Sequence, residues 1–477
     1  MNGRFAPDFP RPPFPLASVS NGEFCPRPPT QRQMQVARLL QEEAETRARR
    51  HGMTRAQFLR TAMGTATAFM VLNRVHGLDA WGDDAVFPVQ KIECDDPEAA
   101  AFLSDSYFIM DVQTHHVDLT LPFLQNPVVM QSVCGLRFRD RGPTCEASLQ
   151  LLGQLNFVKE MLIDSETDVA VISGIPGGSI LPVDTMAQTR DLANQLAGSE
   201  RMLSQAMIDP KEPPGSQTSI DSMERQVREL GARTVKCYTG SGSWWLDAED
   251  SGIPLIEEAQ RLGVDVINVH KGLADILGPM AKEWVRSRDL PVVSAAYPDM
   301  KFVAYHSGFE LDGTGIGDFV DNLAPIPRKK RKNVYAEIGS TFALTSSNPE
   351  QAAHVLGQLL KLVGPKRILW GTDSIWWGSP QWQIEAFKRV QIPASMREEF
   401  GYPPLTEKVK RRIFGLNAAR LYKVKPKQTR CAIPAEAVAA VLGGPYGPLP
   451  GRSNVVYGPR TRREFLTLLR RERGLVA

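Results

Sequence analysis

Short apolar runs alternate with longer amphipathic stretches between residues 105 and 425. The amphipathic stretches, such as 219–230, 255–262 and 351–363, have apolar residues at helical spacing, and several end at glycine or at glycine and proline. The apolar runs have the length and composition of buried strands. Eight such runs are found, at residues 107–112, 169–173, 202–208, 234–238, 264–269, 302–305, 334–338 and 368–370.

Eight strand–helix repeats within residues 105–425 predict an α/β fold, the (β/α)8 TIM barrel. A doubly wound open sheet is the alternative. That fold usually carries a glycine-rich phosphate loop after its first strand, and no such loop follows the first run here. We therefore expect a barrel with extensions at both ends.

The N-terminal extension divides into two parts. Residues 1–50 combine a proline-rich arm with a charged helix over 31–50. Residues 51–104 hold an apolar stretch and a linker. The segment 54–73 resembles a twin-arginine export signal in which Ala56 replaces the second arginine, and its apolar part is too short to span a bilayer. It predicts either a helix packed on the barrel of a cytoplasmic protein or a degenerate signal that directs the chain to the periplasm.

The C-terminal extension covers residues 426–477. Clusters of proline and glycine are followed by Thr461-Arg-Arg-Glu464, which has the form of a capping box. We expect a terminal helix here, acting as a strap or as an oligomerisation element.

Composition and charge narrow the class of protein. Lys plus Arg number 56 and Asp plus Glu 53, so the net charge of +3 gives no support to a nucleic-acid or membrane-surface partner. Hydrophobic residues make up 42%, which is ordinary for a globular chain with a large core and no membrane span. The six cysteines include no C-x-x-C pair, so we expect no zinc ribbon and mostly reduced, buried thiols.

Side chains suited to metal binding follow several of the predicted strands. In a closed barrel, the carboxyl ends of all strands meet on the face where barrel enzymes have their active sites. Imidazole and carboxylate groups are ligands for zinc and similar divalent ions. Five such residues follow the predicted strands, namely His115, His116, His270, His306 and Asp373. This pattern predicts a catalytic metal centre.

Several motifs at these positions resemble those of a known family. The sequence reads DVQTH at 111–115, VHKG at 269–272, AYHSG at 304–308 and GTD at 371–373. These motifs are similar to the signature strands of the amidohydrolase superfamily. The segments 295–301 and 413–422 fit its amidohydrolase-2 branch, which includes aminocarboxymuconate-semialdehyde decarboxylase-like enzymes. The resemblance implies a barrel of the metal-dependent hydrolase type.

The resemblance also implies roles for individual residues. His115, His270 and Asp373 would bind one divalent ion, zinc or alternatively manganese. The ion would lower the pKa of a bound water and polarise a carbonyl group. Asp373 would take the proton of that water and return it to the leaving group. His306 would act as a nearby acid or base, or stabilise the developing oxyanion.

One position departs from the family pattern. The pattern D-x-H-x-H has a histidine where this chain has Gln113. Three arrangements are open. Gln113 is a weak ligand through its carbonyl oxygen, His116 substitutes for the missing imidazole, or three protein groups hold the ion, which suffices for a catalytic zinc. A barrel that has lost its metal is a further alternative.

Two charged residues on predicted strands have open roles. Lys236 lies in the run 234–238, where some superfamily members carry a carbamylated lysine. It would otherwise contact a carboxylate of the substrate or be purely structural. Glu337, in the run 334–338, would orient a ligand through a hydrogen bond or be structural. His116 is a second candidate for such a supporting role.

Four tryptophans follow the predicted strands 234–238 and 368–370. They would line a pocket for a flat or aromatic small-molecule substrate, or simply pack on the barrel rim. They are Trp244, Trp245, Trp376 and Trp377.

Three functions agree with these features. The first is a metal-dependent hydrolase of an amide, ester or lactone. The second is a metal-dependent non-oxidative decarboxylase of an aromatic or unsaturated acid, and Gln113 favours it slightly because its position can supply an oxygen ligand. The third is a metal-free scaffold or binding subunit. Relatives of the branch are often dimers, so a homodimer is expected.

Overall fold

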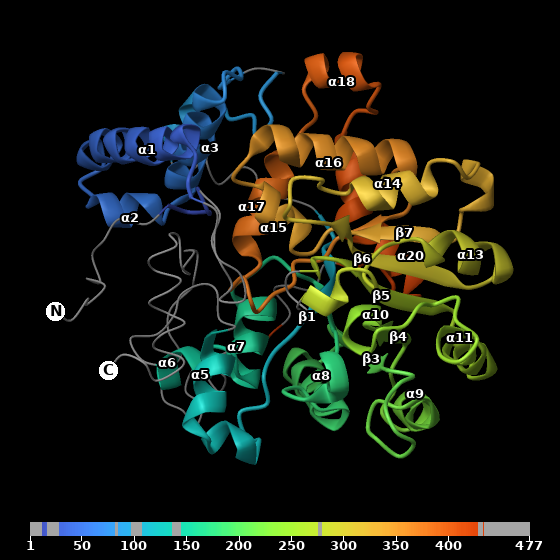
Figure 1. Cartoon of the computed structure of the whole chain (residues 1–477). Helices are drawn as coiled ribbons and strands as arrows, with labels where there is room; N and C mark the ends of the chain where they lie inside the picture. The colour runs from blue at the N-terminus through green and yellow to red at the C-terminus, as the bar shows by residue number, and fades with distance from the viewer. Residues whose placement is uncertain are drawn as a thin grey trace.

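A single parallel sheet forms the centre of the molecule (Figure 1). The computed structural model describes residues 12–16, 28–81, 84–96, 107–135, 145–274, 279–427 and 433. Eight strands follow one another in the order of the chain, and each pairs in parallel with the next. The strands are β1 (Met110–Thr114), β2 (Val169–Ile172), β3 (Met202–Met207), β4 (Thr234–Cys237), β5 (Val266–Gly272), β6 (Lys301–Phe309), β7 (Val334–Glu337) and β8 (Ile368–Leu369).

The segment that follows β8 returns to β1 and closes the sheet. Val112 N–H donates to the carbonyl of Trp370 at 3.1 Å, and Asp373 N–H donates to the carbonyl of Gln113 at 3.0 Å. The (β/α)8 barrel predicted from the sequence is therefore confirmed, and the doubly wound open sheet is wrong.

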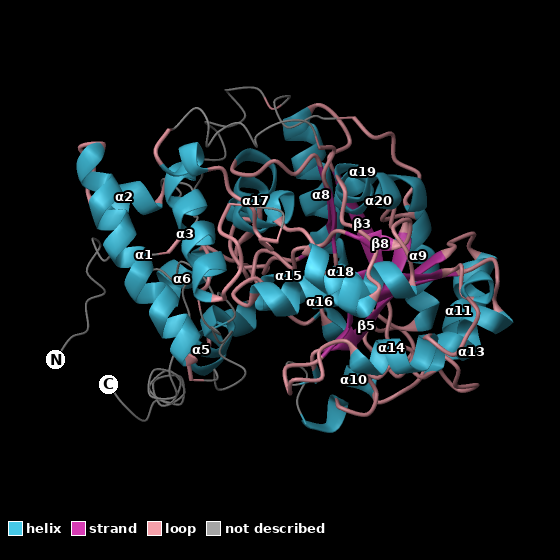
Figure 2. Ribbon diagram, turned by 90° about the horizontal axis from the view of Figure 1, so that it is seen from above, coloured by secondary structure: helices cyan, strands magenta, loops and turns pink. Residues whose placement is uncertain are grey.

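Helices surround the strands (Figure 2). The helices that alternate with strands from β2 onward are α8 (Val183–Ala197), α9 (Met223–Arg228), α10 (Thr239–Gly242), α11 (Gly252–Arg261), α13 (Asp289–Ala296), α14 (Gly317–Leu323), α15 (Thr341–Thr345), α16 (Pro349–Leu362), α17 (Gln381–Arg389), α18 (Ala394–Phe400), α19 (Glu407–Arg411) and α20 (Asn417–Leu421). Between β1 and β2 lie α5 (Pro127–Gly135), α6 (Cys145–Gln150) and α7 (Gln154–Val158). Short 3-10 or π turns are η1 (Lys91–Cys94), η3 (Pro122–Gln125), η4 (Lys159–Ile163), η5 (Pro176–Gly178), η6 (Ile220–Ser222), η7 (Pro279–Ala281), η8 (Arg328–Lys330) and η9 (Arg412–Leu416).

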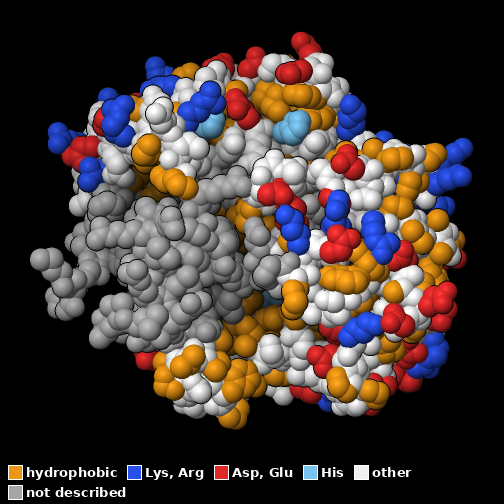
Figure 3. Space-filling view, viewed as in Figure 1, with side chains coloured by type: hydrophobic (Ala, Val, Ile, Leu, Met, Phe, Trp, Pro, Cys, Tyr) orange, Lys and Arg blue, Asp and Glu red, His pale blue; other side chains and the backbone are white. Residues whose placement is uncertain are grey.

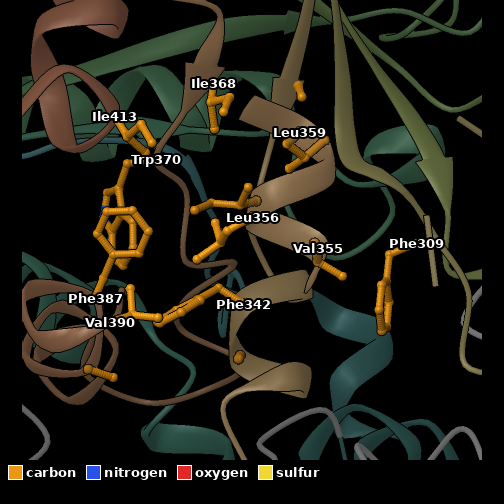
Figure 4. Close-up of a cluster of buried hydrophobic side chains, with 14 of the residues drawn as sticks. Phe309, Phe342, Val355, Leu356, Leu359, Ile368, Trp370, Phe387, Val390 and Ile413 are labelled. Atoms are coloured by element: carbon orange, nitrogen blue, oxygen red, sulfur yellow. The ribbon is translucent and has the colours of Figure 1, made fainter. Parts of the chain in front are cut away.

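Helix α16 illustrates how the barrel wall is built. Its N-cap is Asn348, whose side chain accepts from the N–H of Gln351, and Pro349 occupies the first helical position. Apolar residues at helical spacing, including Leu356 and Leu359, face the barrel. Figure 4 shows these side chains beside aromatic side chains from the region of β8 and α17, all buried in one core cluster.

Two strands run beyond the ends that the sequence pattern predicts. Strand β5 continues past His270 to Gly272, with a register shift between these two residues against β6. Strand β6 continues past His306 to Phe309. The apolar pattern stops at the histidines because the following residues are polar or glycine. Both histidines therefore lie within strands rather than after them.

The N-terminal helices pack together beside α17 (Figure 1). They are α1 (Gln31–Arg50), α2 (Arg55–Leu59) and α3 (Ala62–Val75). The charged helix expected over residues 31–50 is confirmed as α1, and the Thr30–Gln33 capping box starts it. The side chain of Asn73 in α3 makes hydrogen bonds to both backbone groups of Phe87, 2.6 and 3.2 Å long.

Residues 54–73, which resemble an export signal, form α2 and most of α3 in this structure. Eleven of the fourteen residues of α3 are buried among the core side chains of the protein. This burial agrees with the expectation that the segment is a packed helix. In the part of the chain that the structure describes, no helix is long and apolar enough to cross a membrane.

Other expectations at the periphery have mixed outcomes. The helix expected from Thr461 lies outside the described residues, as does most of the proline-rich arm. The expectation of mostly reduced cysteines is wrong for one pair, because Cys134 of α5 and Cys145 of α6 form a disulfide. Figure 3 shows acidic and basic side chains interspersed over one face of the barrel, as the near-neutral net charge predicts.

Candidate functional site

Side chains from four strand ends meet at the carboxyl end of the barrel. Asp373, which follows β8, lies 3.2 Å from Nε2 of His115 through its Oδ1 atom. The same oxygen accepts a hydrogen bond from Nε2 of Gln113 at 3.0 Å. The Gln113 amide also lies 3.3 Å from Nε2 of His306, whose ring centroid is 4.6 Å from that of His270. The strand-end residues that the sequence singled out are thus brought together, with the exception of His116.

In the pair formed by His115 and Asp373, a ring nitrogen faces a carboxylate oxygen. Nδ1 of His115 lies 2.8 Å from the carbonyl oxygen of Ser173, and a carbonyl can only accept, so Nδ1 carries the proton. In a neutral imidazole, Nε2 then presents a lone pair to the Asp373 carboxylate. Two electron-rich atoms at this distance repel each other unless a positive charge lies between them. A proton on His115 or a cation would supply that charge.

Gln113 and His306 form the complementary, neutral part of the site. His306 places Nδ1 2.7 Å from the Gly339 carbonyl, so its Nε2 faces the Gln113 amide as an acceptor. Both N–H groups of the amide are then used, one toward His306 and one toward Asp373. The carbonyl oxygen Oε1 of Gln113 is buried and makes no hydrogen bond among the described residues.

His270 has buried ring nitrogens that are not satisfied. Its side chain is 3% exposed, and neither nitrogen meets a partner at hydrogen-bond geometry among the residues that the structure describes. The ring stacks on Tyr238, with centroids 5.0 Å apart. Burial lowers the pKa of His270 well below its ordinary value, so the imidazole is neutral and has a lone pair available for a ligand.

Buried carboxyl groups brace the strand ends. Glu337 of β7 accepts hydrogen bonds from the backbone N–H groups of His306, at 3.0 Å, and Gly339. Asp111 of β1 accepts from Thr372 N–H at 3.1 Å and from its hydroxyl, and so ties β1 to the segment after β8. Burial raises the pKa of Glu337 to about 8 and that of Asp111 to about 7.

The charge of the site is held mainly on Asp373. Burial by itself would raise the pKa of this carboxyl, but the hydrogen bond and charge of His115, with His306 and Ser340, bring it down to about 2. Burial lowers the pKa of His306 to about 4, so its imidazole is neutral. Asp373 is 6% exposed, so these interactions act with little solvent screening.

Lys236 points into the same part of the barrel. Its ammonium nitrogen lies 3.6 Å from the ring centroid of Tyr305 and 4.6 Å from that of Tyr238. The nitrogen is buried and donates no hydrogen bond to a partner among the described residues. Burial lowers the pKa of Lys236 to about 7, although the charges of Glu337 and Asp373 oppose this shift.

His116 lies away from the group. Its Nε2 is 2.9 Å from the hydroxyl of Thr189 in α8, and its ring packs on Phe157 of α7. It borders a separate cleft of about 360 Å³ between the loop after β1 and these helices. The hypothesis that His116 replaces the missing imidazole is therefore wrong, because successive residues of an extended chain point to opposite sides.

The four tryptophans do not form one wall. Trp376 stacks on His115, with ring centroids 5.5 Å apart, and is half-buried. Trp377 is buried and donates to Ser340. Trp245 is covered by the Arg288 guanidinium, 3.9 Å from its ring, and Trp244 is buried beneath the loop. Of the four, Trp376 contacts the candidate site at His115, and Trp377 contacts it at Ser340.

The donor set can be compared with the needs of a divalent ion. Two imidazoles and a carboxylate suit zinc or manganese, and the ring nitrogens of His270, which lack a hydrogen-bond partner among the described residues, are atoms that such an ion would satisfy. Oε1 of Gln113 would be a further donor once the amide is turned over, since its N–H group now faces Asp373. Within the described part of the chain, no three His, Cys, Asp or Glu side chains converge closely enough to hold an ion as they stand. The residues fit a metal by chemistry, and His270 would have to move toward Asp373.

Residues after β7 are prominent in the site although sequence reasoning passed over them. Ser340 donates a hydrogen bond to Asp373, Gly339 accepts from His306, and Thr341 donates its hydroxyl to the His306 carbonyl at 2.8 Å. Their only signal in the sequence is their place directly after the predicted strand 334–338.

A comparison with known protein families matches about half of the chain. The model of the family described as Amidohydrolase matches residues 183–424. None of the curated proteins matches the chain in sequence.

Solved structures of similar fold are distant in sequence. The 5-carboxyvanillate decarboxylase LigW from Sphingomonas paucimobilis is 14% identical over 67% of this chain and 100% of its own, with a TM-score of 0.43. A 2,6-dihydroxybenzoate decarboxylase from Rhizobium is 16% identical over 66% of this chain and 98% of its own, with a TM-score of 0.40. A probable 2-pyrone-4,6-dicarboxylic acid hydrolase from Acinetobacter baumannii is 12% identical over 66% and 99%, with a TM-score of 0.41.

Proposed function

The chain belongs to the amidohydrolase family of enzymes, and from this premise we propose that it is a metal-dependent hydrolase of a small amide, ester or lactone. The observation that carries the proposal is the His115–Asp373 pair, 3.2 Å apart, beside a buried His270 whose ring nitrogens lack a hydrogen-bond partner among the described residues. His115, His270 and Asp373 would hold one divalent ion, zinc or alternatively manganese, with Gln113 Oε1 as a weaker fourth donor. When bound, such an ion lowers the pKa of water and polarises a carbonyl.

Side chains of the protein would carry out the proton transfers of the reaction. The Asp373 carboxylate would accept the proton of the attacking water and return it to the leaving group. His306 has its proton on Nδ1, so its Nε2 is placed to accept a proton or a hydrogen bond rather than to donate one. Glu337 keeps the His306 backbone in place through the N–H group of that residue.

The remaining residues suggest where the substrate binds. Trp376, stacked on His115, offers an aromatic surface for a flat substrate. In the described part of the chain, the buried ammonium group of Lys236 has no hydrogen-bond partner, and an anionic substituent of the substrate would provide one.

Decarboxylation of an aromatic or unsaturated acid is the second candidate. Gln113 favours it, because its amide, turned with Oε1 toward the ion, would supply an oxygen ligand where the family pattern has an imidazole. Incubation in H₂¹⁸O with lactones, esters and aromatic acids separates the two reactions. Incorporation of ¹⁸O into the product indicates hydrolysis, and release of carbon dioxide indicates decarboxylation.

The metal content of the purified protein tests the common premise. We expect about one zinc or manganese ion per chain by elemental mass spectrometry, and loss of this ion in His270→Ala and Asp373→Ala. His354→Ala is the matched control, because His354 lies on α16 and contacts Tyr402 at 2.8 Å, away from the site. A native protein that binds no ion even after reconstitution would exclude both the hydrolase and the decarboxylase and leave the scaffold.

A further inference from the structure

The backbone between β7 and α15 makes an unusual turn at Ser340. Its φ is 54° and its ψ is −39°. Thr341 N–H donates to the carbonyl of Gly339 at 2.6 Å, which closes a three-residue γ-turn around Ser340. A γ-turn with positive φ at its centre is rare and strained for a residue with a side chain. Glycine would adopt this conformation at a lower steric cost, so the presence of serine points to a use for the hydroxyl group.

The hydroxyl of Ser340 lies in a directed chain of hydrogen bonds. It accepts from Nε1 of Trp377 at 2.8 Å and donates to Oδ2 of Asp373. The direction is fixed, because an indole N–H can only donate and the hydroxyl then has its single proton for the carboxylate. Ser340 is 2% exposed and Trp377 is 3% exposed, so water does not compete for these bonds.

These two hydrogen bonds determine which oxygen of Asp373 faces the other site residues. Oδ2 is engaged by Ser340, while Oδ1 is directed to His115 and Gln113. Asp373 itself has a φ of 58°, so its backbone is also held in an uncommon conformation. A carboxylate fixed at one oxygen is presented to a ligand through the other.

We propose that Ser340, held by Trp377, is the positioning residue that presents Oδ1 of Asp373 to the divalent ion. This inference rests on the proposed function, since it concerns the ion that Asp373 would bind. It adds two residues that no motif of the family resemblance includes. Groups that orient metal ligands in this way typically contribute a factor of about 10–100 to metal affinity.

The variant Ser340→Gly tests the hydroxyl separately from the fold. It removes the hydrogen bond to Asp373 and at the same time relieves the strained turn, so we expect the metal-free protein to melt close to the wild type. Equilibrium dialysis of the full-length chain against Zn²⁺, and separately Mn²⁺, measures the affinity. We expect the Kd of Ser340→Gly to rise about 10-fold or more. Trp377→Phe keeps the ring and loses the N–H donor, so it should raise the Kd by a smaller factor.

Ser346→Ala is the matched control. Ser346 is also buried, but its hydroxyl donates only to the carbonyl of Ala343 in the same helix, at 2.9 Å, so its metal affinity should not change. A wild type that binds one ion with Ser340→Gly within twofold of it would overturn the proposal. If Ser340→Gly did not fold, an unchanged affinity in Trp377→Phe would overturn it equally. A wild type without an ion would remove the proposed function itself, and this inference with it.

Discussion

At the residue scale, Gln113 departs from the family pattern, which has a histidine at this position. It donates to Asp373 at 3.0 Å, and its own Oε1 has no hydrogen-bond partner within the described ranges of the chain. In the absence of an ion this orientation is favourable, because an N–H group faces the carboxylate. An oxygen ligand would require the opposite orientation, with Oε1 toward the ion.

Gln113→Glu should therefore make the protein depend more strongly on its ion. Two carboxylates then face each other without a proton between them, so we expect the metal-free variant to lose roughly 1–3 kcal/mol of unfolding free energy. The added charge should tighten the binding of Zn²⁺ about 10-fold, which corresponds to about 1.4 kcal/mol. Thermal melting with and without Zn²⁺ measures both effects. An equal shift of the melting temperature by Zn²⁺ in variant and wild type would contradict this prediction.

Neighbouring residues show how far the sequence reaches at this scale. His115 and His116 are adjacent, and the strand pattern implies that only one of them points into the barrel. Which one does so depends on the closure of β1 against the segment after β8, since Ile375 N–H donates to the carbonyl of His115 at 3.1 Å. The same closure brings Trp376 onto the His115 ring, whereas nothing in the sequence distinguishes Trp376 from Trp377.

At the scale of elements, the hydrogen bonds of Asp111 hold the last strand segment against the first. Thr372→Val keeps the shape of the side chain and removes the hydroxyl that donates to Oδ2 of Asp111. We expect a loss of about 1.5–3 kcal/mol in unfolding free energy, because the buried Oδ2 of Asp111 loses its donor, while Oδ1 keeps the backbone N–H groups of Gln113 and residue 372. Urea denaturation measures this loss. Thr345→Val is the control, since the Thr345 hydroxyl is equally buried but bonds to two carbonyls of its own helix, at 2.8 and 3.3 Å. An equal cost in both variants would argue against the closure role.

Helix α19 carries a buried lysine that makes stability depend on pH. Lys410 is 6% exposed, and burial lowers its pKa to about 8, although Glu407 at 3.7 Å opposes the shift. Because the folded state releases the proton more readily than the unfolded state, unfolding free energy should rise between pH 8 and about 10.5, the range between the two pKa values. The same contribution is lost as the pH falls through 8.

The variant Lys410→Met isolates this effect. At pH 7 it should be more stable than the wild type by about 1–3 kcal/mol, because no charge has to be buried. The difference should shrink as the pH rises from 8 past 10.5, above which the lysine is mostly neutral in both states. Chemical denaturation at several pH values tests this, and a difference that is constant with pH would contradict it.

At the scale of the whole molecule, the N-terminal helices and the barrel share one core. Phe69 of α3 stacks on Phe87 with ring centroids 4.7 Å apart, and both belong to the cluster that includes barrel side chains. Glu93 of η1 and Arg389 of α17 form a buried ion pair of 2.6 Å across this junction. The two parts are therefore expected to unfold together.

A double-mutant cycle tests the coupling at this junction. Glu93→Gln and Arg389→Met should each cost about 3–5 kcal/mol, because either change leaves one charge buried without its partner. The double variant should cost less than the sum of the two by about 1–3 kcal/mol. Urea denaturation followed by circular dichroism and by tryptophan fluorescence should give one coincident transition. Additive costs or two separate transitions would show that the N-terminal helices unfold independently.

Local patterns in the sequence are enough to predict the barrel and the side chains that meet at its carboxyl end. Eight apolar runs separated by helical periodicity predict eight strands, because both patterns are local and depend only on which residues avoid water. The carboxyl ends of parallel strands must meet on one face, so His115, His270, His306 and Asp373 could be grouped without coordinates.

The hydrogen bonds and directions of those side chains depend on contacts that exist only in the folded protein. Ser340 is invisible to periodicity, because its role depends on a strained turn after β7 and on an aspartate 33 residues later in the chain. The direction of His116 and the covering of Trp245 by Arg288 depend likewise on contacts between distant segments. A pattern of polarity determines which residues are buried, but side-chain direction is set by the backbone angles and neighbours that barrel closure imposes.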